Sequence, residues 1–251
     1  VILIDWNCRD RFCALESLND QTVAREGYEL VWVNYFDRIP QQAMDMADVV
    51  VSCNYSTEKV HKHKAYNAGM LHASGRVVCV PDSDAWFPRN FIETLRGEFL
   101  NTTNQVVFIH EFRSGNPYPA GFAGDRSPYS WQELRANYGA CVTMPADLIF
   151  ALGGFDEHES YEGLVCGPYD LAWRMINLGA PEKWLDQSTV AICHFGHPGS
   201  DSGGDPTDRG HAPTAVAGLR EGRLLPIVEN ESIRTKRLER RRMENTLRNV
   251  L

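Results

Sequence analysis

The sequence lacks a Cys-x-x-Cys pair, a glycine-rich phosphate loop and any apolar run long enough to cross a membrane. The missing cysteine pair argues against a zinc site. No Gly-x-Gly-x-x-Gly follows a predicted strand, which excludes a dinucleotide dehydrogenase. The turn after the first predicted strand, at residues 5–9, has no glycine and therefore does not resemble the phosphate loop expected of a nucleotidyltransferase.

Charge and cysteine usage narrow the class of protein further. The net charge is −8, so the chain as a whole is not built to bind the phosphates of nucleic acid. The seven cysteines are scattered and mostly flanked by apolar residues, which predicts buried, reduced thiols. With no visible signal peptide, this pattern indicates a cytoplasmic protein. The chain opens on a strand-like run without Met, which suggests a trimmed chain or an excised domain.

Predicted strands alternate with predicted helices along most of the chain. The strands are predicted at residues 1–4, 29–33, 48–53, 77–84, 106–112, 138–144 and 189–193. The helices are predicted at residues 11–19, 59–74, 89–99, 131–137, 146–152, 170–178 and 231–251, with loops at 114–130 and 199–213. This order indicates an α/β fold with a doubly wound, mostly parallel central sheet flanked by helices. We expect one domain at residues 1–217 and a basic helical tail at 218–251.

Two aspartates one residue apart follow the apolar run at residues 77–80. Continuous apolar runs of this kind are typical of strands buried on both faces in a parallel sheet. Open α/β sheets bind ligands at the carboxyl ends of such strands. Asp82 and Asp84 can therefore share one hard divalent cation, directly or through water and diphosphate oxygens. Such a cation neutralises the charge that builds on a departing diphosphate.

Several other short motifs surround this aspartate pair. They are KAYNAG at 64–69, ASG at 73–75, Pro88, GGFDE at 153–157, LAWR at 171–174 and HFGHP at 194–198. In combination they resemble the family-2 glycosyltransferases of the GT-A fold, over residues 1–198. The resemblance implies that residues 1–100 bind a nucleotide sugar and that residues 101–217 bind the acceptor and carry catalysis.

The resemblance implies a donor site for a nucleotide sugar, usually one with uracil as the base. Trp6 follows the first strand, where a flat indole suits stacking on uracil. Asn34 or Asp37 would contact the base, although the family usually has an Asp-Asp pair there. Lys64 would offset the charge of the diphosphate. The expected donor-site residues are Asp5, Trp6, Asn7, Asn34, Asp37, Lys64, Asn67, Asp82, Ser83 and Asp84.

The metal site implied by the resemblance centres on the second aspartate. Asp84 would ligate the metal ion, and Asp82 would lie near the ribose and the donor sugar as a second carboxylate. His194 or His197 would complete the metal shell. Oxygen ligands and a diphosphate suit Mn²⁺ or Mg²⁺, and an imidazole ligand favours Mn²⁺.

The catalytic base is the feature in which this sequence departs from the family. A Glu-Asp pair usually precedes the helix that LAWR resembles, and its Asp deprotonates the acceptor. Gly167-Pro168 stands in those places here. The chain therefore uses Asp170 as the base, borrows Glu162 from the preceding loop, or lacks this base. Asp170 is also a good helix N-cap.

The resemblance implies a metal-dependent, inverting transfer of a sugar to a hydroxyl of a glycan, a lipid-linked acceptor or a small molecule. The loop at 199–213 would close over the donor and exclude water. The Gly167-Pro168 replacement favours an alternative, a catalytically silent domain that binds a nucleotide sugar or a glycan. A retaining enzyme with the same donor site is a third possibility.

The tail at 231–251 carries seven Lys or Arg residues against three Glu residues. It is predicted to be a solvated helix that packs its Leu238, Leu247 and Leu251 side on the domain. The other interpretation is contact with anionic lipid headgroups at the inner face of a membrane, which suits a lipid-linked acceptor.

Overall fold

The fold begins with a parallel sheet that positions the first part of the candidate site. The computed structural model describes residues 1–6, 11–55, 59–134, 136–162, 167–196, 217–223 and 226–250. The first sheet has the order β1-β2-β3 and consists of β1 (Ile2–Asp5), β2 (Val31–Asn34) and β3 (Val49–Ser52). Asp5 lies opposite Asn34 in the parallel register, so the polar ends of two strands meet at one edge.

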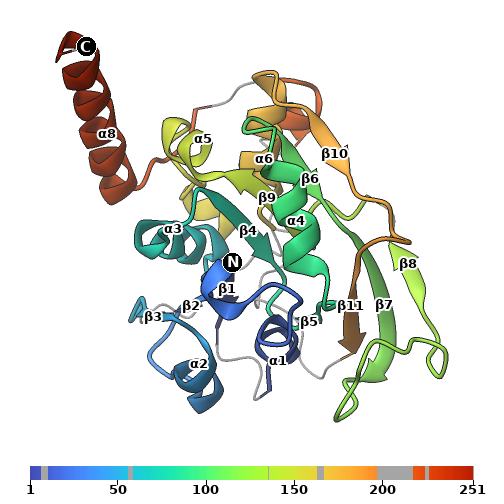
Figure 1. The fold of residues 1–251 in the computed structure, drawn as a ribbon. Helices are drawn as coiled ribbons and strands as arrows, with labels where there is room; N and C mark the ends of the chain where they lie inside the picture. The colour runs from blue at the N-terminus through green and yellow to red at the C-terminus, as the bar shows by residue number, and fades with distance from the viewer. Residues whose placement is uncertain are drawn as a thin grey trace.

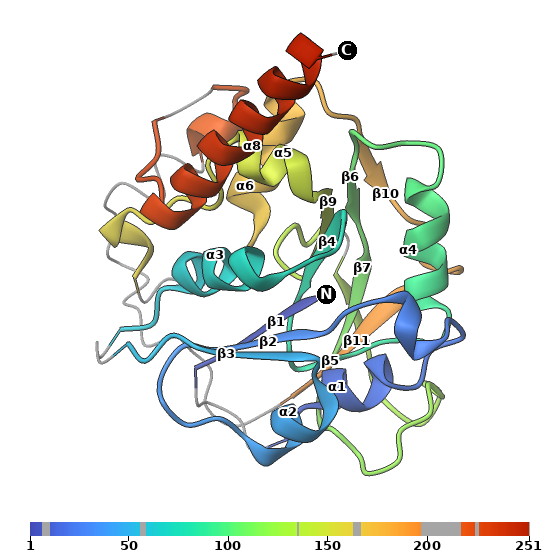
Figure 2. The ribbon, with the colours of Figure 1, turned by 60° about the vertical axis from the view of Figure 1, so that its left-hand side comes forward.

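Side chains of β1 alternate between two hydrophobic layers, as expected for a parallel strand buried on both faces. Ile4 packs in one cluster with Tyr66, and Leu3 packs in the other with Leu15. The helices on these faces are α1 (Cys13–Leu18), α2 (Gln41–Met46) and α3 (Lys62–His72). Figure 2 shows α3 on one side of the sheet and α1 and α2 on the other.

A second, mixed sheet continues the core beyond β1. It has the order β10-β6-β9-β4 and consists of β4 (Val77–Pro81), β6 (Val106–Phe108), β9 (Cys141–Pro145) and β10 (Glu182–Trp184). β9 runs antiparallel to both of its neighbours, whereas β10 and β6 are parallel. Its covering helices are α4 (Phe91–Phe99), α5 (Ala146–Ala151) and α6 (Tyr169–Asn177). In Figure 2, α4 lies on one side of this sheet and α5 and α6 on the other.

A third sheet brings Asp84 close to His194. It has the order β5-β11-β7-β8 and consists of β5 (Ala85–Trp86), β7 (His110–Pro117), β8 (Gln132–Leu134) and β11 (Ala191–Gly196). β5 begins directly after Asp84 and pairs antiparallel with β11, so that Ala85 lies opposite His194. Two short 3-10 helices, η1 (Arg25–Gly27) and η2 (Glu159–Tyr161), complete the connections.

The last helix, α8 (Glu231–Val250), projects from the body of the protein (Figure 1). Its first turns dock through Ile233, which is fully buried, and through Lys236, which donates to the Leu71 carbonyl. Leu238 is 43% exposed, so the predicted packing through Leu238 is wrong. The Leu247 side chain and Leu251 lie outside the part that the structure describes. Among the described residues, no helix is long and apolar enough to cross a membrane.

The predicted α/β class is confirmed, and the differences are local. The expected helix at 131–137 is wrong, because residues 132–134 form β8 and pair with β7. β7 runs into the segment predicted as a loop at 114–130. α2 and β10 were not predicted, and both are short elements whose pattern is weak in isolation. The first sheet is entirely parallel, whereas the other two are mixed: β10 and β6 are parallel in the second, and β7 and β11 are parallel in the third. β9 interrupts the parallel order in the second sheet.

Gly69 provides a test of the close approach between α3 and the first sheet. A Cβ at this position would lie 2.5 Å from Ile2 Cγ2 and 3.0 Å from Val33 Cγ2. We expect Gly69→Ala to lower the free energy of unfolding by about 1–2 kcal/mol in urea denaturation, because overpacking outweighs the better helix propensity.

The matched control is Gly97→Ala in α4, where an added Cβ meets nothing within 4 Å. This change should leave stability unchanged or raise it by up to about 1 kcal/mol. Equal stability of Gly69→Ala and the wild type would contradict the packing described for α3.

Candidate functional site

A cavity of about 810 Å³ opens where β1, β4 and β11 end. Its walls come from the end of β1, from α3, from the turn after β4, from β7 and β8, and from the end of β11. The strand ends supply polar side chains, and α3 supplies Lys62 and Tyr66. The cavity therefore joins both halves of the chain at the edge where the parallel strands terminate.

The structure brings six of the expected site residues to this cavity. They are Asp5, Trp6, Asp82, Ser83, Asp84 and His194. Their roles stay predictions, but they share one cavity although they come from three separate stretches of sequence. Asn7, His197 and the loop at 199–213 lie outside the described residues.

The other expected donor-site residues do not line the cavity. Asn34 is fully buried and donates to the Phe36 carbonyl, so it holds the turn after β2. Asp37 is exposed beyond that turn. Asn67 is buried, and its side chain is bonded to the segment at 153–157. We infer no donor contact for these residues from the geometry.

Lys62 occupies the place in the cavity that the sequence suggested for Lys64. Residues two apart on a helix point about 200° apart, so only one of the two can face the cavity. Lys62 Nζ lies 4.7 Å from the centre of the Trp6 ring, a cation–π contact that fixes the indole. Lys64 Nζ lies instead 3.9 Å from Glu162 Oε1. The sequence did not show at which residue α3 begins, and this start decides which of the two lysines faces the cavity.

A chain of charged side chains runs from the cavity into the protein. Asp84 Oδ1 lies 3.2 Å from His194 Nε2, and His194 Nδ1 lies 3.0 Å from Glu111 Oε1. The Glu111 carboxylate also accepts hydrogen bonds from Arg113 and Asn137. Sequence reasoning missed both residues: Glu111 lay inside the strand predicted at 106–112, and Arg113 follows that predicted strand but belongs to β7.

These contacts change the proton affinities of the cluster. Burial favours the neutral imidazole, but the hydrogen bonds to Asp84 and Glu111 outweigh it and raise the pKa of His194 to about 10. Burial and the neighbouring Asp84 carboxylate raise the pKa of Asp82 to about 7. Burial opposes the charge of Glu111, yet its hydrogen bond to His194 holds the pKa below the ordinary value. The His194 imidazolium therefore lies between the carboxylates of Asp84 and Glu111, and a metal cation bound by Asp84 and His194 would replace the proton on Nε2.

The Asp84 and His194 pair fits the geometry of a divalent cation site. Two ligands on adjacent corners of an octahedron, each with a bond of about 2.1 Å, are about 3 Å apart. Asp84 Oδ1 and His194 Nε2 have this spacing. Within the described ranges, no group of three or more His, Cys, Asp or Glu side chains could hold a metal ion. A cation here would take its remaining ligands from water and a diphosphate, as Mg²⁺ commonly does.

Ser83 fixes the turn that carries both aspartates. Its hydroxyl donates to the Ile4 carbonyl, and the Ile4 amide donates to Ser83 Oγ at 3.0 Å. The Cys13 thiol donates to the Asp84 carbonyl at 3.1 Å. These bonds tie the turn after β4 to β1 and α1, so Asp82 and Asp84 have a defined position relative to Asp5.

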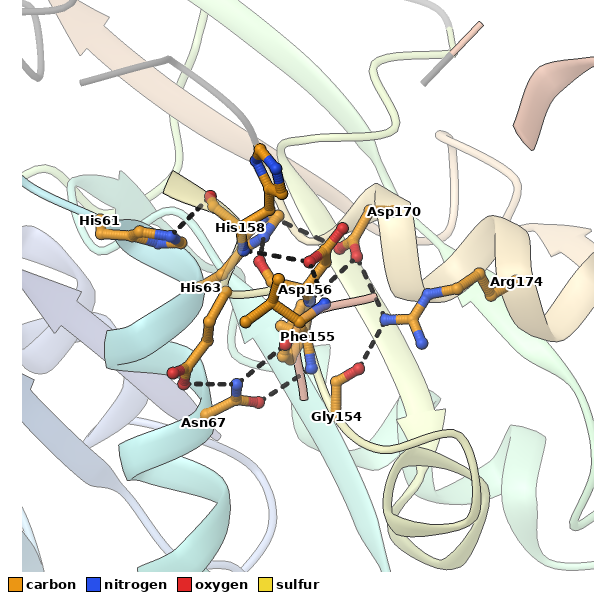
Figure 3. A network of polar contacts seen from close by, with 11 residues as sticks. His61, His63, Asn67, Gly154, Phe155, Asp156, His158, Asp170 and Arg174 are labelled. Carbon is orange, nitrogen blue, oxygen red and sulfur yellow. Dashed lines mark hydrogen bonds and ion pairs between the residues drawn. The ribbon is translucent and has the colours of Figure 1, made fainter. Parts of the chain in front are cut away.

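Asp170 lies in a second polar network outside the cavity lining (Figure 3). Its side chain is 1% exposed, and Oδ2 lies 3.2 Å from Arg174 Nη2. Arg174 also donates to the carbonyls of Leu152 and Gly154. The network joins the start of α6 to the glycine turn after α5. Asp170 is in the first turn of α6 and Pro168 is the N-cap, so the expected N-cap role is wrong.

Asn67 holds the same glycine turn from the side of α3 (Figure 3). It exchanges hydrogen bonds with the Phe155 amide and carbonyl, both at 2.9 Å, and donates to Glu157 Oε1. Gly154 has φ +74°, and a Cβ there would lie 2.5 Å from Asn67 Oδ1. The KAYNAG and GGFDE motifs are therefore two sides of one contact between α3 and the second half of the chain.

The buried pair of Asp170 and Arg174 predicts a large loss of stability on truncation. Asp170→Ala should lower the free energy of unfolding by about 3–5 kcal/mol, because it leaves the Arg174 guanidinium buried without its counter-charge. Urea denaturation measures this loss.

Asp20→Ala is the matched control, since Asp20 forms an ion pair with Arg89 in which both side chains are about two-thirds exposed. Exposed pairs contribute about 0–1 kcal/mol, so this variant should stay within that range. A similar loss in both variants would refute the structural role of Asp170.

Comparison with known proteins gives a family match that overlaps the site. The sequence model described as glycosyl transferase family 2 matches residues 14–147, slightly more than half of the chain. A glucosyl-dolichyl phosphate glucuronosyltransferase of Haloferax volcanii is 25% identical over 140 residues, which are 51% of this chain and 44% of that protein. The chain thus spans less than half the length of this curated relative.

Solved structures show the same fold at low sequence identity. A mannosyltransferase from Pyrobaculum calidifontis, in complex with GDP-Man and Mn²⁺, has a TM-score of 0.52 and 18% identity, covering 77% of this chain and 55% of its own. S. aureus TarS 1-349 in complex with UDP-GlcNAc has a TM-score of 0.62 and 13% identity, covering 94% of this chain and 70% of its own. At these identities the likeness concerns the fold alone.

Proposed function

Because the chain belongs to glycosyl transferase family 2 and has the GT-A fold, we propose that it transfers a sugar from a UDP-sugar to an acceptor hydroxyl with inversion. One observation carries this proposal. The carboxylate of Asp84 and the imidazole of His194 converge at 3.2 Å in the cavity that Trp6 and Lys62 also line. This arrangement would offer two cation ligands, a cationic side chain and an aromatic face in one place, which together suit a nucleoside diphosphate.

The donor lies in the cavity in this proposal. Trp6 stacks on the uracil, because its ring is held by Lys62 and faces the cavity. The Lys62 ammonium neutralises part of the diphosphate charge, a role that Lys64 was expected to have. Asp5 and Asp82 line the same cavity, and in this proposal they accept hydrogen bonds from ribose or sugar hydroxyls. The complex of S. aureus TarS with UDP-GlcNAc is a precedent for a uridine donor on this fold.

Asp84 and His194 hold the cation in this proposal, and Mn²⁺ suits a mixed carboxylate and imidazole set. The cation supplies charge neutralisation to the leaving diphosphate. Ser83 supports Asp84 by tying the turn to β1. The Pyrobaculum calidifontis mannosyltransferase was solved with Mn²⁺, which is a precedent for this cation on the same fold.

We infer that Glu162 is the base, because it is the more accessible of two candidates, neither of which lines the cavity. A base must reach the acceptor hydroxyl, and the Asp170 side chain is 1% exposed and bonded to Arg174. The Glu162 side chain is 31% exposed. In the proposed step, Glu162 takes the hydroxyl proton, the oxygen bonds to the anomeric carbon, and the bond from that carbon to the diphosphate breaks on the opposite face.

The acceptor in this proposal is a lipid-linked sugar or glycan. The Haloferax volcanii relative is named for a glucosyl-dolichyl phosphate, which is such a molecule. Arg234 and Arg241 of α8 are exposed and would face anionic headgroups. Other basic residues of this helix bond to the domain instead, as Arg237 does with Glu229.

Donor binding tests the proposal with a matched pair of lysines. In calorimetric titration, one UDP-sugar of a panel should bind the wild type only when Mn²⁺ is present. Lys62→Met should weaken that binding about tenfold or more, because it removes a charged contact in the cavity. Lys64→Met should bind as the wild type does, since Lys64 lies outside the cavity lining. Equal effects of the two changes would contradict the position of the diphosphate.

Turnover measurements test whether Glu162, and not the buried Asp170, is the base. Glu162→Gln should lower kcat about 100-fold or more while donor affinity stays unchanged, as expected for loss of a general base. The control is Glu159→Gln, an exposed carboxylate in the neighbouring η2. Full turnover by Glu162→Gln would exclude it as the base. Donor binding without turnover by the wild type, with every acceptor offered, would instead identify a catalytically silent domain.

A further inference from the structure

Glu111 is a fully buried carboxylate that lies directly behind His194. Its Oε1 is 3.0 Å from His194 Nδ1 and accepts hydrogen bonds from Arg113 Nε at 3.1 Å and Nη2 at 2.9 Å. Its Oε2 accepts from Asn137 Nδ2 at 2.5 Å. A buried carboxylate is costly unless it is bonded in this way, so this position needs an explanation beyond core packing.

The strand register places Glu111 and its partners on one face of the third sheet. β7 and β11 are parallel, with His194 opposite Arg113 and Ile192 opposite Glu111. Residues 111 and 113 are two apart on β7 and therefore point to the same side as His194. Asn137, which precedes β9, donates to the other carboxylate oxygen, Oε2. The Glu111 carboxylate is thus held by β7 and by the segment before β9 while it contacts a side chain of β11.

This arrangement decides which nitrogen of His194 faces the cavity. An ionised carboxylate only accepts hydrogen bonds, so the Nδ1 atom beside Glu111 must carry a hydrogen. The other nitrogen, Nε2, points to Asp84 at 3.2 Å. Nε2 also faces a carboxylate and carries a hydrogen toward Asp84 until a cation takes the place of that hydrogen. With Nδ1–H still bonded to Glu111, the ring then directs its Nε2 lone pair toward the cation.

We propose that Glu111 is a positioning residue that orients His194 and keeps Nε2 available to the cation, an inference that rests on the proposed function. Glu111 does not line the cavity, so it acts through His194 and touches neither the cation nor the donor. A carboxylate that accepts from the second nitrogen of a ligating histidine fixes the ring and raises its basicity. Arg113 and Asn137 in turn fix the carboxylate.

The first test measures Mn²⁺ affinity in the presence of UDP, from the electron paramagnetic resonance signal of free Mn²⁺. Glu111→Leu should weaken Mn²⁺ binding by about 10–100-fold, the usual effect of losing such a partner. Glu111→Gln should weaken it less, because the amide oxygen still accepts from Nδ1. Glu182→Gln is the control, since Glu182 bonds Tyr138 and Trp184 outside the cavity. Thermal unfolding without metal and UDP verifies that each variant is folded.

Wild-type Mn²⁺ affinity in a folded Glu111→Leu variant would overturn the inference and leave the proposed function intact. No Mn²⁺ binding by the wild type would overturn both.

The second test needs no substitution and decides the matter if the variants do not fold. Nitrogen-15 spectra of the wild type with diamagnetic Mg²⁺ and UDP report which ring nitrogen of His194 carries the hydrogen. The expected result is a hydrogen on Nδ1 and a metal-shifted Nε2. A hydrogen on Nε2, or a metal-shifted Nδ1, would refute the orienting role of Glu111.

Discussion

The contact between Asp84 and His194 is the constraint on which the candidate site depends. It joins the turn after β4 to β11, and both are positioned by backbone pairing before any ligand is considered. β5 starts at the residue after Asp84 and pairs with β11 so that Ala85 faces His194. A shift of one residue in this register would turn the His194 side chain to the opposite face of the sheet. The two-residue strand β5 therefore determines where His194 lies relative to Asp84.

Two further sets of buried contacts hold the parts of the site in one arrangement. Ser83 ties the aspartate turn to β1, which places Asp82 and Asp84 beside Asp5 and Trp6. Asn67 and His63 of α3 bond the backbone at 155 and 156, so α3 spans the two halves. The cavity is lined by both halves, and its geometry depends on these buried bonds as much as on the residues that would touch a ligand.

Local sequence patterns predicted the part of the site that lies at strand ends. Asp5, Trp6 and the aspartate pair each follow an apolar run, and the position after such a run determines their place at the sheet edge. The resemblance to a family added His194, whose role a single histidine could not have indicated. These residues were predictable because each depends on an element that is recognisable by itself.

The remaining residues depend on information that is not local. The choice between Lys62 and Lys64 depends on where α3 begins, and helix starts are the least certain part of a pattern. Glu111 appears as one polar residue in a core strand until β11 pairs beside it. Asp170 was a candidate base close to the expected place in the sequence, but only the tertiary structure shows that it is buried against Arg174. The segment at 131–137 forms β8 because β7 provides a partner strand.

The central claim is that Asp84 and His194 hold one cation for a nucleoside diphosphate. An anomalous difference map from crystals containing Mn²⁺ and UDP tests it most directly. The account predicts one peak at about 2.1 Å from both Asp84 Oδ1 and His194 Nε2. A peak that lies elsewhere, or bound UDP with no peak at these two side chains, would contradict it.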